Sequence, residues 1–454
     1  MSDARIHLVS SLREHWKVAA VLAVVLTVLV CEGAVLWRQR GTGNAAAGEP
    51  AVEEGEFFIA LREDNPHVPR MYRLNVVQRT LRSTPPVDLA TVHADLDTFI
   101  AAHGLRNESL DASLSWPHKE LPFVTRSTGA VTSCRLDALC LASLLVLVNV
   151  TRGTLPLELW VDAPLPPAAA RAVDTLLGPR VRVRDLHETA GAYAARFGAL
   201  EPALFPNAFH RKLQALASSA FARALWVDGD AFVLRDPRPA LPHTAPVVVW
   251  RDMSAVDARN PVWALLGAPP AQAFGGESGL VLVDRGDAGA ARALQLAAYM
   301  NQHQNAFYRL VYGDKDTFAL ACRALRVPHT VVPHLPTVVG RRSFLQAAPD
   351  GRPLFVHLPG PGKRDFVDAM HSSDPHAFWG RILRFDPNDA HVARAHGGRL
   401  VVVADRRGAL ISAHDPARVV GAHSINLIHD MYRIAEAALA GDSPDSTVGS
   451  GSNA

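Results

Sequence analysis

Two aspartates that flank a glycine, Asp228-Gly229-Asp230, stand directly after the apolar run at 224–227. Two carboxylates at this spacing can turn toward one hard divalent cation, because such ions prefer oxygen ligands. A cation held there can neutralise the charge that builds on a diphosphate leaving group. The triplet also fits an Asp-Gly turn between two strands, since Asp-Gly is a common turn signal. Its place at the end of a hydrophobic strand favours the metal site.

A second polar group follows another apolar run, more than a hundred residues later in the chain. His357 comes directly after the run at 354–356, and Gly360 and Lys363 follow it. An imidazole can be a third metal ligand, and a glycine-rich turn with a lysine can bind phosphate. The alternative is a solvated histidine at a strand end. The motifs Asp-x-Asp and His-x-x-Gly-x-x-Lys together indicate a metal–diphosphate site without a P-loop, and therefore nucleotide-sugar chemistry.

Short apolar runs alternate with longer helical patterns over the part of the chain that carries these motifs. Strands are predicted at 157–161, 181–183, 224–227, 247–250, 280–283, 354–356 and 399–404. Helices are predicted at 87–102, 136–149, 168–177, 210–222, 286–300, 314–325 and 425–439. This alternation predicts an α/β fold with a mainly parallel sheet flanked by helices. Ligands bind such sheets at the carboxyl ends of the strands, where both motifs lie.

The first residues predict a membrane anchor. The run at 18–37 is apolar and has about the ~20 residues that a helix needs to cross a bilayer, although Glu32 interrupts it. An uncleaved signal-anchor is favoured over a cleaved signal peptide, because no small-residue cleavage site follows the run. The predicted organisation is a cytoplasmic tail 1–17, an anchor 18–37, a stem 38–120, a catalytic domain 121–385, a C-terminal α/β extension 386–440 and a disordered tail 441–454.

Composition excludes some classes of protein. Lys and Arg number 46 and Asp and Glu 44, so the net charge of +2 gives no electrostatic argument for nucleic-acid binding. A hydrophobic content of 48% excludes a mainly disordered chain. Four cysteines are too few for a disulfide scaffold; Cys134 or Cys140 can pair with Cys322, or all three can be buried thiols. Asn107 and Asn149 are candidate glycosylation sites in Asn-x-Ser/Thr triplets.

Several segments resemble glycosyltransferase family 71, the fungal Mnn-type α-mannosyltransferases. The clearest are LWVDGDAFVLRDP, ESGLVLVDR and FYRLVYGDKDTFALACRAL, and the resemblance spans about 121–363. It implies a Rossmann-like GT-A fold in a single-pass type II Golgi membrane protein with a lumenal catalytic domain. The implied reaction is retaining transfer of mannose from GDP-mannose to a mannosylated glycan acceptor, with Mn²⁺ or another divalent cation. The element at 357–363 is also similar to the His-x-x-Gly-x-x-Lys motif of glycogenin-like family 8 enzymes.

The resemblance also implies roles for single residues. Metal ligands are Asp228, Asp230 and His357, and the same two aspartates bind the donor together with Lys212, Gly360 and Lys363. Ser278, Gly279 and Asp314 contact sugar, and Glu277 and Asp316 are candidates for the catalytic carboxylate. Gly229 departs from the commoner Ala or Ser, and Gly276 stands where the family has Gln. A loop at 128–135 is expected to hold the nucleotide base.

Alternatives stay open for several of these residues. Glu277 can be a solvated loop carboxylate, Asp314 can cap the helix at 314–325, and the transfer can run through a carboxylate or by same-face attack. Four tryptophans fit the core better than sugar stacking: Trp160, Trp226, Trp250 and Trp263. Two further functions compete with the mannosyltransferase. One is a retaining Golgi transferase that uses a UDP-sugar, and the other is an inactive, membrane-tethered lectin-like domain.

Overall fold

The computed structural model describes the chain from residue 88 onward, with gaps. The described residues are 88–107, 125–198, 209–242, 244–256, 258–271, 273–340, 343–380, 382–385, 393–396, 399–402, 410–413 and 420–440. Contacts divide the chain into residues 1–53 and 54–454, and every described residue belongs to the second unit. The anchor predicted at 18–37 lies outside the described residues. Within them, no helix combines the length and apolar character needed to cross a membrane.

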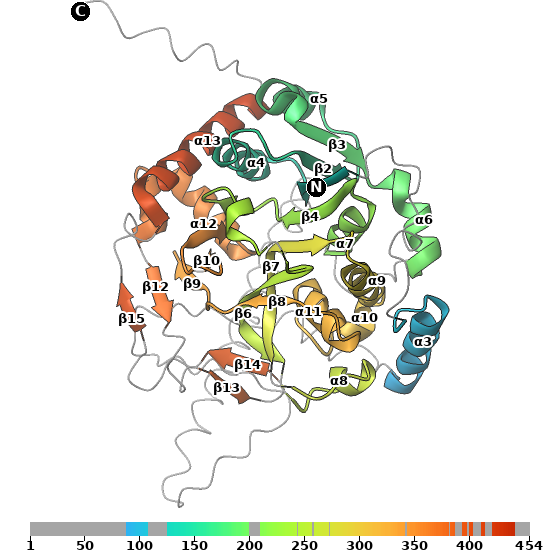
Figure 1. Cartoon of the computed structure of the whole chain (residues 1–454). Helices are drawn as coiled ribbons and strands as arrows, with labels where there is room; N and C mark the ends of the chain where they lie inside the picture. The colour runs from blue at the N-terminus through green and yellow to red at the C-terminus, as the bar shows by residue number, and fades with distance from the viewer. Residues whose placement is uncertain are drawn as a thin grey trace, which may run out of the picture. The chain divides into compact units, whose positions relative to one another are not determined.

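The larger sheet of the described part runs in the order β13-β14-β6-β7-β4-β1-β2-β3, with β8 paired to β6 (Figure 1). Its strands are β1 Thr125–Ser133, β2 Leu157–Val161, β3 Val181–Asp185, β4 Phe221–Val227, β6 Val247–Val256, β7 Ala273–Asp284, β8 Thr330–Val332, β13 Ala393–His396 and β14 Arg399–Val402. Strands β3, β2, β1 and β4 are parallel neighbours, as the sequence predicts. Strand β7 then lies antiparallel between β4 and β6. The α/β class is therefore confirmed, with a parallel half and an antiparallel half.

The second sheet is antiparallel, with the order β15-β12-β9-β10-β11-β5. Its strands are β5 Ala231–Val233, β9 Thr337–Val339, β10 Ser343–Ala347, β11 Pro353–His357, β12 Ile382–Phe385 and β15 Leu410–Ala413. Three residues separate the end of β4 from the start of β5, so the chain passes from one sheet to the other through Asp228-Gly229-Asp230. The main acidic motif therefore lies where the two sheets meet.

Helices cover both faces of the larger sheet (Figure 1). They are α3 Leu89–Ala102, α4 Ala138–Val150, α5 Pro167–Ala172, α6 His187–Phe197, α7 Phe209–Ser218, α8 Val262–Leu265, α9 Ala288–Gln302, α10 Gln304–Phe307, α11 Asp314–Ala324, α12 Pro361–Met370 and α13 Ala422–Ala440. Short 3-10 or π turns occur at Val173–Leu177, Gly178–Arg180, Arg238–Ala240 and Pro375–Gly380. Two large apolar cores result, and the four tryptophans named above are buried in them, which confirms their assignment to the core.

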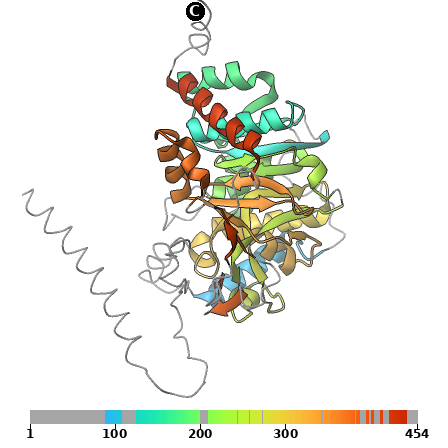
Figure 2. The same ribbon diagram turned by 90° about the vertical axis from the view of Figure 1, so that its left-hand side faces the viewer.

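Helix α4 shows how the sequence builds one of these cores. Its residues, ALCLASLLVLVNV, are apolar on every side, which is typical of a helix buried on all faces. Asp137 caps its first turn by accepting a hydrogen bond from the backbone N–H of Cys140. The C-terminal helix α13 packs against α4, and its red ribbon lies beside it in Figures 1 and 2. Strand β14 pairs with β6. Two segments of the predicted C-terminal extension are therefore part of the main fold: β14 extends the larger sheet, and α13 belongs to the helices beside it.

Several predicted elements have different bounds in the structure. The strand predicted at 247–250 extends to Val256, and the strand predicted at 280–283 begins at Ala273. The helix predicted at 210–222 ends at Ser218, because Phe221 already pairs with β1 in the sheet. The predicted base-binding loop at 128–135 is mostly strand, since residues 130 and 131 pair with both β2 and β4. The loop that follows β1 begins at Cys134.

Candidate functional site

The Asp-Gly-Asp segment forms a tight turn between β4 and β5. The N–H of Ala231 donates to the carbonyl of Asp228 at 2.9 Å, and the N–H of Asp228 donates to the carbonyl of Gly279 at 2.9 Å. The turn is therefore fixed by the neighbouring strand β7 as well as by its own bond. The sequence allowed two interpretations of Asp228-Gly229-Asp230, a turn between strands or a pair of metal-binding carboxylates. The structure has the turn, and the turn also carries the two carboxylates.

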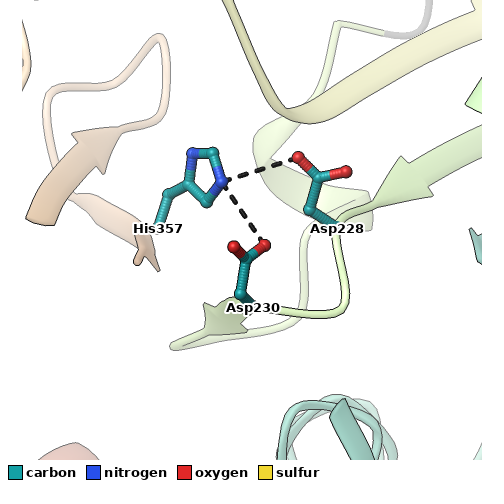
Figure 3. Close-up of side chains that lie close together, drawn as sticks. All are labelled: Asp228, Asp230 and His357. Carbon is teal, nitrogen blue, oxygen red and sulfur yellow. Dashed lines mark ion pairs between the residues drawn. The ribbon is translucent and has the colours of Figure 1, made fainter. Parts of the chain in front are cut away.

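His357 comes to the two aspartates through the register of the second sheet. Strand β11 pairs with β5 so that His357 stands opposite Ala231, the residue after Asp230. Its Nε2 lies 3.5 Å from Asp228 Oδ2 and 3.4 Å from Asp230 Oδ1 (Figure 3). The residue is only 8% exposed, so the solvated-histidine alternative is wrong. Asp228, Asp230 and His357 thus offer three ligand atoms within 4.8 Å of one another.

Glu277 holds the other side of the imidazole. Its Oε1 lies 2.8 Å from His357 Nδ1 and accepts a hydrogen bond from the N–H of Gly279 at 2.6 Å. Glu277 is buried in β7, so it is not a solvated loop carboxylate. With Nδ1 held by this carboxylate, Nε2 is the nitrogen that faces the two aspartates and could bind a cation in exchange for its proton.

Gly279 lets the imidazole come close to β7. A Cβ at this position would lie 2.8 Å from the His357 ring, a distance that real Cβ atoms do not adopt. The Glu-Ser-Gly triplet therefore has a packing reason for its glycine. Glu277 and Gly279 both contact His357, and Ser278 contacts Lys212.

Lys212 is a buried cation behind the turn. Its Nζ lies 3.2 Å from Asp228 Oδ1 and 2.9 Å from Asp314 Oδ2, and it donates to Ser278 Oγ at 2.7 Å. These contacts make Lys212 the counter-ion of two carboxylates. Asp314 does not cap α11, because the cap residue is Gly313; its side chain pairs with Lys212 instead.

Asp316 connects α11 to strand β7. Its Oδ1 accepts a hydrogen bond from the N–H of Gly276, and its Oδ2 accepts one from the N–H of Tyr312, both at 2.8 Å. A Cβ on Gly276 would lie 2.1 Å from the carbonyl oxygen of Lys315. Close approach of α11 therefore explains the glycine at the position where the family has Gln. Lys315 in turn pairs with the buried carboxylate of Asp252, a residue that no sequence motif indicated.

Lys363 approaches the aspartates from the opposite side. It lies in the first turn of α12, which begins after Gly360, and its Nζ is 2.8 Å from Asp230 Oδ2. Gly360 has a φ of 53°, a backbone conformation that favours glycine. The Lys363 side chain is half-exposed, so its ammonium group faces solvent as well as Asp230.

Charges set the ionisation of this cluster. Burial alone would raise the pKa of Asp230, but His357 and Lys363 beside it lower that pKa well below its usual range. For Asp228, burial is the larger effect and raises its pKa despite the nearby Lys212. Burial opposes protonation of His357, yet Glu277 and Asp230 raise its pKa well above 6.5. In this cluster, positively charged groups are therefore in direct contact with negatively charged ones.

The donor set fits a divalent cation. Two carboxylate oxygens and one imidazole nitrogen suit Mn²⁺, which accepts both oxygen and nitrogen ligands. The far nitrogen of the imidazole has a hydrogen-bond partner, here the Glu277 carboxylate; metal-bound histidines almost always have a carboxylate, backbone carbonyl or water in this place. The residues that the sequence predicts as metal ligands are thus brought together by the fold.

A disulfide between Cys134 and Cys140 was missed at the level of sequence. The two residues are six positions apart, across the loop from β1 into α4. Cys322 is a free, buried thiol, so the alternative in which it pairs with Cys134 or Cys140 is wrong, and the buried-thiol alternative is confirmed for Cys322. The available signal was local: one cysteine directly after a strand, and another in the first turn of the next helix.

Comparison with known proteins bears on the class of enzyme. Residues 271–351 match a family model described as "Mannosyltransferase putative". The matched segment carries Glu277, Ser278, Gly279, Asp314 and Asp316. It does not include Asp228, Asp230 and His357, the three candidate metal ligands. No curated protein sequence matches the chain.

Solved glycosyltransferases have partly similar structures. Mouse xyloside xylosyltransferase 1 in its apo form is 14% identical, with a TM-score of 0.33 over 45% of this chain and 85% of that one. Core-mannan synthase A from Aspergillus fumigatus, in its Mn/GDP form, is 8% identical with a TM-score of 0.30, over 50% and 77% of the two chains. The mannosyltransferase Ktr4p of S. cerevisiae with GDP is 9% identical with a TM-score of 0.30, over 54% and 79%. Of these comparisons, the family match bears on function, and it supports the predicted enzyme class, a glycosyltransferase.

Proposed function

We propose that this chain is a retaining α-mannosyltransferase of family 71 with a GT-A fold. It moves mannose from GDP-mannose to a mannose-containing glycan and depends on Mn²⁺ or another divalent cation. The observation that carries this proposal is the cluster of Asp228, Asp230 and His357 within 4.8 Å, with Lys363 beside it. The mannosyltransferase match over residues 271–351 supports the choice of sugar.

The residues of the chain have distinct roles in this proposal. Asp228, Asp230 and His357 hold the cation, which when bound neutralises charge on the donor diphosphate. Lys363, half-exposed at the start of α12, donates to the departing diphosphate. Glu277 keeps the imidazole in place through Nδ1, and Lys212 balances Asp228 and Asp314. The acceptor hydroxyl oxygen then forms the new bond to the anomeric carbon while the bond from that carbon to the donor phosphate oxygen breaks, and the hydroxyl proton passes to that phosphate oxygen.

We favour same-face transfer over a covalent intermediate. Both candidate nucleophiles are already engaged, since Glu277 binds His357 and Asp316 accepts two backbone N–H bonds. A carboxylate nucleophile must be oriented toward the anomeric carbon, whereas these contacts orient Glu277 toward His357 and Asp316 toward the backbone of Gly276 and Tyr312. The engaged carboxylates therefore support the route in which the diphosphate itself assists the acceptor.

A donor screen tests the proposed function. The full chain would be assayed with Mn²⁺ against GDP-mannose and a set of UDP-sugars, both for hydrolysis and for transfer to defined mannose acceptors. We expect GDP-mannose to be turned over. We expect Asp230→Ala and His357→Ala to lose at least about 100-fold in rate, or about 3 kcal/mol of transition-state stabilisation.

Asp236→Asn is the matched control, because Asp236 lies six residues after Asp230 but pairs with Arg238 outside the cluster. It should keep wild-type activity. Turnover of a UDP-sugar in place of GDP-mannose would establish the other transferase reading. Full activity of a folded Asp230→Ala variant would contradict the assignment of the site.

We further propose a single-pass type II location in the Golgi membrane, with the catalytic domain in the lumen. The apolar run at 18–37 supports it, and so does the Cys134–Cys140 disulfide, since disulfides persist in oxidising compartments. Asn107 and Asn149 are both exposed, as glycan acceptors must be. Protease protection of the domain in sealed microsomes, with a mobility shift on deglycosylation, is the expected result; digestion from the cytoplasmic side would exclude this orientation.

A further inference from the structure

The Cys134–Cys140 disulfide packs directly on the turn between the two aspartates. A Cβ built on Gly229 would lie 2.6 Å from Cys134 Cβ, 3.2 Å from Cys134 Sγ and 3.3 Å from Cys140 Sγ. Real Cβ atoms essentially never come within 3.0 Å of another heavy atom, so only glycine fits against this disulfide without a shift. The glycine that departs from the family's Ala or Ser therefore has a local cause, which is the close approach of Cys134, with the two disulfide sulfurs directly behind its Cβ.

The topology explains why these groups meet. Strands β1 and β4 are parallel neighbours, so their carboxyl ends lie at the same edge of the sheet. Cys134 follows the end of β1 and Asp228 follows the end of β4. Cys140 lies in the first turn of α4, so its bond to Cys134 closes the β1–α4 loop against the Asp-Gly-Asp turn.

Helix α4 holds the same turn at a second point. The hydroxyl of Ser143 donates to the carbonyl of Ala231 at 2.6 Å, one residue after Asp230. Residues 229 and 231 are thus both in contact with the first turns of α4, through the disulfide and through this hydrogen bond. The carboxylates of Asp228 and Asp230 project from the segment that these contacts fix.

We propose that the Cys134–Cys140 disulfide is a positioning element that holds Asp228 and Asp230 in the geometry needed for a divalent cation. The affinity of this site for the cation depends on the bond being intact. This inference rests on the proposed function, because it concerns the same site. The bond closes a loop with a sequence separation of only six, where the entropic gain in overall stability is smallest. Its main effect therefore falls on the turn that it touches.

The direct test measures Mn²⁺ binding by the full chain, with free Mn²⁺ followed by electron paramagnetic resonance. Cys134→Ala/Cys140→Ala should bind Mn²⁺ at least about tenfold more weakly than the wild type, the size of effect expected for residues that support metal ligands. Reduction of the wild type by a phosphine should have the same effect: the disulfide takes two electrons and two protons to give two thiols, and the phosphine becomes its oxide with oxygen from water. Cys134 is half-buried and so within reach of the reductant.

Cys322→Ala is the matched control, since Cys322 is a buried thiol in α11 without a disulfide. It should bind Mn²⁺ like the wild type and respond to the phosphine in the same way. Circular dichroism of each variant verifies that the fold is retained. If the double alanine variant does not fold, the reduced and reoxidised wild type supplies the same comparison.

A double-mutant cycle tests the contact itself. Gly229→Ala should weaken Mn²⁺ binding at least about tenfold in the disulfide-bonded protein, because the new methyl group meets the disulfide. The same substitution in the Cys134→Gly/Cys140→Ala variant should reduce Mn²⁺ affinity clearly less, since the Cys134 side chain and the Cys140 sulfur no longer obstruct the new methyl group.

Equal Mn²⁺ affinity with and without the disulfide would overturn the inference and leave the proposed function intact. A disulfide-dependent affinity in a protein that turns over neither GDP-mannose nor UDP-sugars would support the inference and reject the proposed function. A wild-type chain that binds no Mn²⁺ would reject both.

Discussion

Glu277 illustrates how one carboxylate can be assigned either to chemistry or to support. Its Oε1 contacts both His357 Nδ1 and the N–H of Gly279, so it orients a metal ligand. Glu277→Ala should therefore weaken Mn²⁺ binding about 10- to 100-fold, and Glu277→Gln, which keeps an acceptor oxygen, should weaken it less. Calorimetric titration with Mn²⁺ measures both. If both variants bind Mn²⁺ normally and lose turnover alike, the carboxylate acts on the sugar instead.

Lys212 is the residue whose removal should most damage the fold of the site. It is 5% exposed and balances Asp228 and Asp314, so Lys212→Met leaves the buried carboxylate of Asp314 and the partly buried one of Asp228 without this partner. We expect a loss of about 3–5 kcal/mol in the free energy of unfolding. Urea denaturation measures it.

The double variant Lys212→Met/Asp314→Asn is the control, because it removes one of the two stranded charges. It should recover part of the lost stability. An unchanged urea midpoint for Lys212→Met alone would mean that Lys212 does not serve as their counter-ion.

The sequence predicts the residues of the site better than their contacts. Asp228, Asp230 and His357 follow apolar runs, and the carboxyl ends of buried strands are where an α/β fold gathers its ligands. The partner of Lys212 could not be predicted in this way, because that contact depends on how α7 packs against β7 and α11. The disulfide between Cys134 and Cys140 likewise depends on a loop path that no spacing rule fixes.

Strand β7 is the element that the sequence describes least well. Its segment AFGGESG contains three glycines, which are typical of a turn, yet this segment pairs with β6 and carries three site residues. Two of those glycines, Gly276 and Gly279, are explained by close neighbours rather than by a turn. Apolar strands such as 157–161 were predicted with the right bounds, because burial on both faces is visible locally. The antiparallel position of β7 between β4 and β6 depends on pairing between distant segments, so it is not visible in the local sequence.

The contact between α13 and the 3-10 helix Pro375–Gly380 predicts that the stability of the fold depends on pH. Trp379 Nε1 donates to His429 Nε2 at 2.8 Å, which requires a neutral imidazole, and burial lowers the pKa of His429 to about 4. Between pH 6.5 and 4 the unfolded chain binds a proton here that the folded chain does not, so stability falls as the pH decreases through this window. Above pH 6.5 this residue is neutral in both the folded and the unfolded chain, so it does not contribute to the pH dependence of stability.

His429→Gln keeps an acceptor for Trp379 but does not titrate. Urea midpoints measured from pH 7 to pH 4 should therefore fall less steeply for this variant than for the wild type. Parallel curves would show that another group causes the acid sensitivity.

At the scale of the whole molecule, the C-terminal residues are part of the catalytic unit. Ile425, Ile428 and Tyr432 are buried against α4 and α12, and Tyr432 contacts the ring of Phe366. Burial of such side chains contributes about 1.5–3 kcal/mol each, so loss of all three approaches the 5–15 kcal/mol that stabilises a typical domain. Removal of residues 420–454 should therefore abolish cooperative thermal unfolding. Removal of 441–454 alone is the control and should leave the unfolding midpoint unchanged; equal behaviour of both truncations would contradict this role of α13.

A hydrogen bond links Trp226 to Asp228, one of the three candidate metal ligands. Its indole Nε1 donates to Asp228 Oδ1 at 2.7 Å, and Lys212 Nζ lies 5.4 Å from the centre of its ring. A divalent ion placed on Asp228 changes the charge within a few ångströms of a buried fluorophore, where such changes act strongly. The protein thus contains its own optical reporter: addition of Mn²⁺ should alter tryptophan emission, and Trp226→Phe should remove most of that response.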